Sequence, residues 1–261
     1  MCSSTPWLAA NPVIILETEL KFKCEQMKNK KPKVICLMMT SLDGKILGEK
    51  WGKSRFVELL KESFEKVHER IGVGAWIVGR KTMEKDFTHY TRPVIKKTKE
   101  GIPRTDFVAV KDAKTFAIAL DGQGKLGWKK PYMHGDHVIT ILTEQVKDGY
   151  LAQLQKIGVS YIFAGKKQVN LNTALEKLRI LFSIKKLMLE GGGHLNGSFL
   201  NEGLIDEFHH LLLPLADGSA ENQSLFEIDE KAKKAKSTLF KLNQVKKIEH
   251  DVLWITYTRK K

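Results

Sequence analysis

Apolar and polar residues follow one another in short periodic runs that predict alternating strands and helices. Continuous apolar runs at residues 34–39 and 75–78 have the length of buried strands. Between them, apolar residues recur at helical spacing from Arg55 to Ile71, which predicts an amphipathic helix. Further short strands are expected at residues 116–120, 138–142, 159–163 and 187–189. The first part of the chain therefore follows a β–α–β order.

The end of the chain has a different pattern. Asn172 is a helix-cap residue ahead of Leu175, Leu178 and Leu181, so a helix is expected just before the strand at residues 187–189. Late strands, without long helices between them, are expected at residues 208–213, 237–242 and 252–258. An early β–α–β order that ends in antiparallel strands predicts the α/β class, a three-layer α/β/α domain with a mixed central sheet.

Two stretches fall outside this pattern. Residues 1–33 have weak periodicity and are interpreted as an N-terminal extension, which leaves residues 34–261 as one domain. Residues 85–112 are basic and contain prolines, so this stretch is expected to be rich in loops.

The composition is that of an ordinary soluble globular protein with an excess of positive charge. Of 261 residues, 42% are hydrophobic and 28% charged, and the formal net charge is +14. Such a charge attracts phosphorylated molecules. The lysine clusters at residues 28–33, 96–99 and 231–236 have no aromatic stacking residues beside them, so we interpret them as solvated surface and do not expect nucleic acid as a partner.

The sequence gives no sign of a membrane segment or a metal site. No run of 18 apolar residues exists, and the apolar run at residues 13–16 is too short for a signal peptide. Cys2, Cys24 and Cys36 form no C-x-x-C pair, and Cys36 lies in an apolar strand as a small core residue. A cytoplasmic protein that contacts no membrane is expected.

The segment from Leu187 to Leu200 carries the most specific chemistry. An apolar strand ends in Glu190, three glycines follow, and an amphipathic helix then runs to a C-cap signal at Gly203. Glycine lets the backbone approach a ligand, and a helix N-terminus favours an anion, so this turn predicts a phosphate site. A glycine-rich turn without a ligand is the alternative.

A second glycine-rich segment is interpreted as a loop. Residues 122–127 match G-x-G-x-x-G and follow a strand, but Trp128 and Pro131 come next, where a dinucleotide-binding fingerprint needs a helix. We therefore expect a hairpin or loop here.

Three further segments accompany the Glu190 turn. They are Thr40–Ile46 and Val78–Asp86, each directly after a strand, and the group Ser54, Arg70 and Arg92. Each has a purely structural alternative: an Asp-Gly turn, a capped helix start, or a helix cap with surface arginines.

Together these segments resemble the reductase domain of riboflavin biosynthesis, the C-terminal domain of RibD, and the related standalone archaeal and fungal diaminopyrimidine reductases. The resemblance extends over about residues 32–258. It rests on the order and spacing of Ser41–Gly44, Lys53–Phe56, Lys66–Arg70, Val78–Thr82, Glu190–Gly192 and Gly203–Glu207. It implies a dihydrofolate reductase-like fold and NADPH-dependent reduction of a phosphorylated ribosylamino-pyrimidine, with hydride transfer to C1′ and no metal. It also implies a homodimer.

The resemblance assigns roles by position. It implies that NADPH contacts Met39, Ser41, Asp43, Gly79, Thr82, Asp86, Gly191, Gly192, Gly193, His194, Leu195 and Asn196. Substrate-phosphate contacts are implied for Ser54, Arg70, Tyr90 and Arg92. Glu190 is implied to be the catalytic carboxylate on the substrate side of the nicotinamide.

The chain departs from the family pattern at several positions, so the exact substrate stays open. Leu37 replaces a common lysine, Asp86-Phe87-Thr88 replaces Asp-Asp-Pro, and Gly122 lies where serine is often found. The zinc deaminase motifs H-x-E and P-C-x-x-C do not occur in the sequence. Two alternatives remain: a reductase of the same fold for a pterin or another small carbonyl or imine, and a non-catalytic basic nucleotide-binding or nucleic-acid-binding protein.

Overall fold

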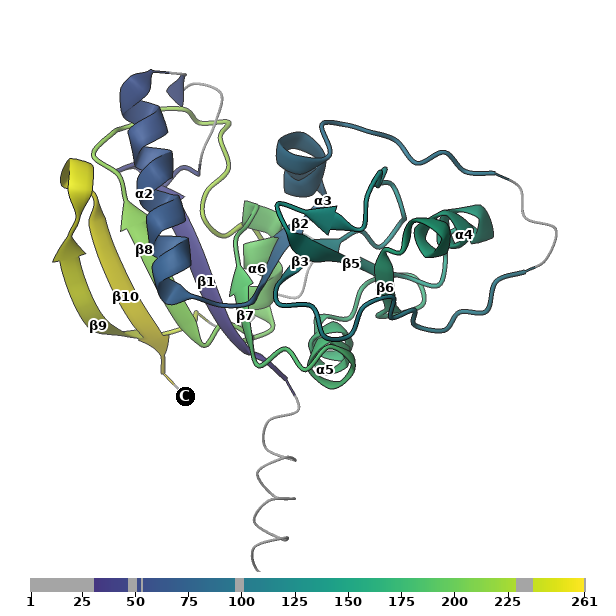
Figure 1. The fold of residues 1–261 in the computed structure, drawn as a ribbon. Coiled ribbons are helices and arrows are strands. Elements are labelled where there is room, and N and C mark those ends of the chain that lie inside the picture. The colour runs from purple at the N-terminus through teal and green to yellow at the C-terminus, as the bar shows by residue number, and fades with distance from the viewer. Residues whose placement is uncertain (1–30, 47–50, 53, 97–100, 229–236, 261) are drawn as a thin grey trace, which may run out of the picture.

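The computed structural model describes residues 31–46, 51–52, 54–96, 101–228 and 237–260. The interpretation of residues 1–33 as an extension falls almost wholly outside the described residues. Figure 1 shows a twisted central sheet with helices on both of its faces. This three-layer arrangement is the α/β/α fold with a mixed sheet that the sequence predicts.

The sheet is parallel in its centre and antiparallel at one end. Its strand order is β4-β5-β3-β2-β7-β1-β8-β10-β9, with β6 also paired to β5. The strands are β1 (Lys33–Thr40), β2 (Ala75–Gly79), β3 (Phe116–Leu120), β4 (Tyr132–Met133), β5 (Asp136–Leu142), β6 (Ser160–Phe163), β7 (Lys186–Leu189), β8 (Glu207–Leu212), β9 (Phe240–Lys247) and β10 (Leu253–Arg259). Strands β9 and β10 form the antiparallel end beside β8.

Two apolar cores lie on opposite faces of this sheet. Alternate residues of β1 divide between them, since Ile35 and Leu37 join one core and Cys36 and Met38 join the other. The first core is covered by α2 (Arg55–Ile71) and α4 (Asp148–Ile157), and the second by α5 (Leu171–Leu181) and α6 (Gly193–Asn201). Cys36 is fully buried, as expected of a small core residue.

Helix α2 has the bounds that the sequence predicts. The hydroxyl of Ser54 caps its first turn by accepting a hydrogen bond from the Val57 backbone, and Gly72 ends it in the left-handed conformation. The buried side chains include Val57 and Leu60, whereas the apolar Phe56 is 45% exposed. In Figure 1 this helix lies across β1 and β8.

Two helices differ from the prediction. The N-cap of α5 is Asn170 rather than Asn172, because the Asn170 side chain accepts from the Thr173 backbone while Asn172 donates to Glu202. Helix α4 was not predicted, since it has no side-chain cap and carries Gly149 in its first turn. A β-carbon at Gly149 would lie 2.1 Å from the Lys96 carbonyl oxygen, so close packing of the loop requires this glycine.

The remaining differences are small. A short helix, α3 (Arg80–Thr82), precedes the stretch that was expected to be rich in loops, and a π-helical turn, η2 (Met83–Phe87), overlaps its start. Strand β9 starts at Phe240 rather than residue 237, and η3 (Glu249–Asp251) joins it to β10. The G-x-G-x-x-G segment is a loop, as predicted, because the next element after β3 is the short strand β4. No helix among the described residues is long and apolar enough to cross a membrane.

Candidate functional site

Four loops meet where the central parallel strands end. The carboxyl ends of β1, β2, β3 and β7 lie side by side in the sheet, so the segments that follow them converge. The Gly79 backbone donates to the Gly191 carbonyl oxygen at 3.0 Å, and the Glu190 backbone donates to that of Ile77 at 3.0 Å. In open α/β sheets, ligands bind at such strand ends.

The first of two clefts at this edge contains Glu190, and we call it the Glu190 cleft. Its volume is about 350 Å³. It includes five residues that the sequence predicted for a site: Met39, Thr82, Asp86, Glu190 and Gly192. Its other walls are Met38, Ile46, Phe64, Val78, Lys81, Lys85, Phe87 and Gln223. This cleft combines apolar walls with a buried carboxylate and two lysines.

The second cleft, the Asp121 cleft, adjoins the first. Its volume is also about 350 Å³. The residues that it shares with the Glu190 cleft are Lys81, Thr82, Gly192 and Gln223. Its remaining walls are Gly79, Arg80, Leu120, Asp121, Gly122, Gln123, His194, Leu195 and Ser198. Because the clefts share one wall, a long ligand is able to extend through both.

Gly192 lies between the clefts and begins helix α6. Its φ of 30° and ψ of 148° form a backbone conformation that L side chains rarely adopt. A β-carbon at Gly192 would lie 3.3 Å from Thr82 Oγ1. The start of a helix offers backbone N–H groups and the positive end of the helix dipole, which suit a phosphate.

Glu190 is paired with His68 of α2. The Nδ1 atom of His68 lies 2.6 Å from Oε1 of Glu190, and the two side chains are 24% and 11% exposed. Burial raises the pKa of Glu190, against the opposing hydrogen bond from His68. The hydrogen bond to Glu190 in turn raises the pKa of His68. The pair thus binds a proton more tightly than a free imidazole does.

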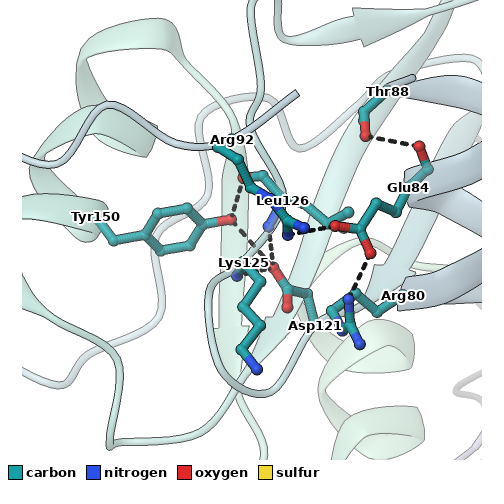
Figure 2. Close-up of polar contacts among 8 residues, drawn as sticks. All are labelled: Arg80, Glu84, Thr88, Arg92, Asp121, Lys125, Leu126 and Tyr150. Atoms are coloured by element: carbon teal, nitrogen blue, oxygen red, sulfur yellow. Dashed lines mark hydrogen bonds and ion pairs between the residues drawn. The ribbon is translucent and has the colours of Figure 1, made fainter. Parts of the chain in front are cut away.

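An ionic network around the buried carboxylate of Glu84 lies beside the Asp121 cleft, and Figure 2 shows the polar contacts of its side chains. The carboxylate of Glu84, 7% exposed, accepts from Arg80 at 2.6 Å and also from Arg92. Arg80 is in addition close enough to Asp121 for its charge to lower the pKa of that carboxyl. Glu84 therefore fixes Arg80 at the wall of the Asp121 cleft.

The Asp121 carboxylate is buried, which disfavours its charged form. Burial raises its pKa to about 6. Its Oδ2 accepts from the backbones of Lys125 and Leu126 at 2.7 and 2.8 Å and from the Tyr150 hydroxyl at 3.4 Å (Figure 2). Its Oδ1 is buried and has no hydrogen-bond partner among the described residues. Asp121 thus shapes the loop of residues 121–127 and leaves one polar atom unsatisfied at the cleft.

Ser41 and Asp43, implied as cofactor contacts, have structural partners instead. The Ser41 hydroxyl accepts from the Lys45 backbone at 3.0 Å. Asp43 accepts from the backbones of Asp217 and Gly218, each at 2.9 Å, and these hydrogen bonds lower its pKa. Neither residue lines the two clefts.

At the start of α6, some of the residues implied as cofactor contacts line a cleft and others do not. His194 and Leu195 line the Asp121 cleft with Gly192. Gly193 and Asn196 lie under a neighbouring segment instead: a β-carbon at Gly193 would be 2.5 Å from the Ser224 carbonyl oxygen, and Asn196 donates to that of Leu225 at 3.1 Å. Gly191 has a φ of 105°, and a β-carbon there would meet Met38.

The four residues implied for the substrate phosphate are not brought together. Ser54 and Arg70 lie at opposite ends of α2, about 24 Å apart at about 1.5 Å per residue. Arg70 lies over the Trp254 ring in a separate cleft, with 5.6 Å from its guanidinium carbon to the ring centroid. Arg92 pairs with Glu84, and Tyr90 is 60% exposed. One phosphate therefore cannot contact all four within a single chain, and a substrate-phosphate role for any of them stays a prediction.

Sequence reasoning did not single out some residues that line the clefts or contact a residue that does. His68 was quoted within a motif but given no role, and Asp121 stands just before a segment interpreted as a loop. Lys81 and Gln223 line both clefts. The sequence could have indicated Asp121 and Lys81 only through their positions just after strands, since residues at strand ends face the ligand crevice. Among the described residues, no group of three His, Cys, Asp or Glu side chains is placed to hold a metal ion.

Comparison with known proteins shows the family to which the sequence is similar. The model of the family described as RibD C-terminal domain matches residues 32–254. A curated 2,5-diamino-6-ribosylamino-4(3H)-pyrimidinone 5′-phosphate reductase from Methanothermobacter thermautotrophicus is 29% identical over 210 residues, which are 77% of this chain and 88% of that protein.

Solved structures share the fold. Acinetobacter baumannii RibD superposes with a TM-score of 0.58 and 21% identity over 90% of this chain, which spans only 60% of that protein. The Saccharomyces cerevisiae riboflavin biosynthesis reductase Rib7 gives a TM-score of 0.58 at 14% identity, over 94% of this chain and 99% of that one.

Proposed function

The chain belongs to the RibD C-terminal domain family, and we propose that it is an NADPH-dependent reductase of a ribosylamino-pyrimidine 5′-phosphate in riboflavin biosynthesis. The product is the ribitylamino form, with an open sugar chain. The name of the archaeal relative, a diaminopyrimidinone phosphate reductase, supports this substrate class. We assign the reductase activity to residues 34–261.

The two adjoining clefts support a nicotinamide dinucleotide as the cofactor. Gly192 leaves open the space beside Thr82 that a side chain would occupy, so a diphosphate is able to approach the start of α6. Arg80 and Lys81 line the Asp121 cleft and supply positive charge for further phosphate groups, which favours NADPH. When bound, the cofactor supplies a hydride.

The Glu190 cleft suits the substrate. Phe64, Val78 and Phe87 give it apolar walls that exclude water from the reacting bond, and Lys81 and Lys85 add positive charge for a phosphomonoester. We assign to Glu190, which lines this cleft, the role of holding a proton at the substrate side. The residues of this chain thus orient the two ligands and set the protonation of the site.

One observation carries the proposal: a buried carboxylate and a helix N-terminus lie on either side of Gly192, in two clefts that share a wall. The test is NADPH oxidation by the purified protein with the diaminopyrimidine and aminouracil ribosyl phosphates as substrates. Dihydrofolate serves as the contrast. Turnover with a ribosyl phosphate supports the proposal, and turnover with dihydrofolate alone overturns it.

Steeply salt-dependent binding of RNA or DNA, without NADPH affinity, would instead support the non-catalytic alternative. Salt-insensitive NADPH affinity argues for the enzyme. The protein concentration and the buffer are held constant in both measurements, so that only ionic strength changes.

The proposal extends to a cytoplasmic homodimer. Leu242 and Val245 of β9 are 52% and 53% exposed, and they pair in register with Tyr257 and Ile255 of β10. Exposed apolar side chains on an edge of the sheet suit a two-fold interface. A solution mass near the 29.7 kDa of one chain, measured by light scattering at micromolar concentration, would contradict it. The buried free thiol of Cys36 is consistent with a reducing compartment.

A further inference from the structure

Reduction of a C=N or C=O bond requires a proton as well as a hydride. The hydride adds to carbon and the proton to nitrogen or oxygen, so each turnover consumes one of each. The nicotinamide supplies the hydride, and the protein must supply the proton. Within the proposed function, the question is therefore which side chains deliver a proton to the Glu190 cleft.

His68 and Glu190 have the geometry for this task. Their 2.6 Å contact joins Nδ1 of His68 to Oε1 of Glu190, and both side chains are largely buried. Glu190 lines the cleft, whereas His68 is on the helix α2 behind it and is the more exposed of the two. His68 does not itself line the cleft, so it acts through Glu190.

The charges around the pair favour its protonated state. Carboxylates of Glu65 on α2 and Asp136 on β5 raise the pKa of both members. Lys81 of α3 and Lys85 and Asp86 of η2 line the same cleft as Glu190, and the positive charges of the two lysines act in the opposite direction. Burial further disfavours the free Glu190 carboxylate, because an unpaired charge is costly in an apolar site.

We propose that His68 is the positioning residue that loads Glu190 with the proton consumed in the reduction. Glu190 gives one proton to the heteroatom of the reduced bond and receives the proton held between its Oε1 and Nδ1 of His68. The ring of His68, 24% exposed, regains one proton from solvent after the turnover. Nothing in the motifs that carry the family resemblance assigned this role, because His68 is far from Glu190 in the sequence.

The test compares His68→Asn with wild type. Asparagine keeps an N–H donor near the position of Nδ1 but does not titrate. We expect kcat to fall about 100-fold, within the range of general acid–base catalysis, while KM for the substrate and Kd for NADPH change less than about threefold. The alkaline limb of the wild-type kcat profile, where the pair loses its proton, should shift, because Glu190 then titrates without His68. His134→Asn, at an exposed histidine outside the clefts, is the matched control.

A second readout does not depend on activity. The pKa of His68, measured by NMR titration of the protein without nucleotide, should lie above the ordinary histidine value and fall in Glu190→Gln. Unchanged titration of His68 in that variant would overturn the proposal, as would a His68→Asn enzyme with wild-type kcat and pH profile. Absence of turnover by wild type with every substrate would instead contradict the proposed function, and the NMR result would still report on the pair.

Discussion

Gly192 and Thr82 face each other so closely that a β-carbon at Gly192 would lie 3.3 Å from the Thr82 hydroxyl oxygen. The contact joins the turn after β7 to the short helix after β2. It also lies where the Glu190 cleft and the Asp121 cleft share a wall. Any side chain at position 192 therefore narrows the passage between the two clefts.

Replacing Gly192 with valine should weaken NADPH binding. The branched side chain would occupy the space next to Thr82 and strain a backbone with φ near 30°. We expect at least a tenfold rise in Kd, which corresponds to about 1.4 kcal/mol, measured by titration of NADPH fluorescence.

Gly135→Val serves as the control, because Gly135 also has a positive φ but no atoms lie within 4 Å of the place that its β-carbon would take. A folded Gly192→Val protein that keeps wild-type NADPH affinity would remove this turn from the cofactor site.

The sequence predicted which residues at strand ends lie together better than it predicted which residues a helix holds apart. Thr82, Glu190 and Gly192 were found because each follows closely after a buried strand, and parallel strand ends meet at one edge of a sheet. Ser54 and Arg70 were grouped by spacing alone, and the helix between them separates them instead. Spacing along a chain does not reveal which residues a long helix holds apart.

Contacts between segments far apart in the sequence could not be predicted either. No local pattern links His68 to Glu190 or Asn196 to Leu225, because these pairs form only when separate elements pack together. Helix α4 was missed for a related reason, since Gly149 lowers helix propensity and is required by the neighbouring loop at Lys96.

Loss of the Asp121 proton should lower the free energy of unfolding as pH rises. Its pKa is about 6 in the folded chain and 3.8 ordinarily, so between these values the folded state keeps a proton that the unfolded state has lost. Stability therefore falls from about pH 4 to pH 6 and then levels off, by at most about 3 kcal/mol.

Asp121→Asn removes this dependence. The amide keeps an oxygen acceptor for the Lys125 and Leu126 backbones and carries no charge. Urea unfolding should show a gain in stability at pH 7.5 that is about 2 kcal/mol larger than the gain at pH 4.5. The exposed Asp112→Asn is the control. Equal gains at both pH values would refute the titration argument.

Glu84→Gln should destabilise the fold. The buried Glu84 carboxylate pairs with both Arg80 and Arg92, and glutamine leaves these cations with a weaker, uncharged acceptor. We expect a loss of about 2–4 kcal/mol in the free energy of unfolding. Glu58→Gln removes an exposed partner of Arg55 and should cost less than about 1 kcal/mol. Similar losses in the two variants would show that burial of Glu84 adds nothing.

The Arg70→Ala variant tests whether Arg70 contacts the substrate phosphate, as the family resemblance implies, or only packs on Trp254, as the structure shows. Arg70 lies over Trp254, in a cleft that Glu190 and Gly192 do not line. From that position we expect a loss of about 0.5–1 kcal/mol in stability, the size of an exposed cation–π contact. NADPH affinity should not change, and KM for the phosphorylated substrate should rise no more than KM for its dephosphorylated form. A substrate-phosphate contact would instead cost about 1.5–3 kcal/mol and act on the phosphorylated substrate alone. Steady-state kinetics with the phosphorylated and the dephosphorylated substrate therefore decide whether Arg70 belongs to the active site or only to the contact between α2 and β10.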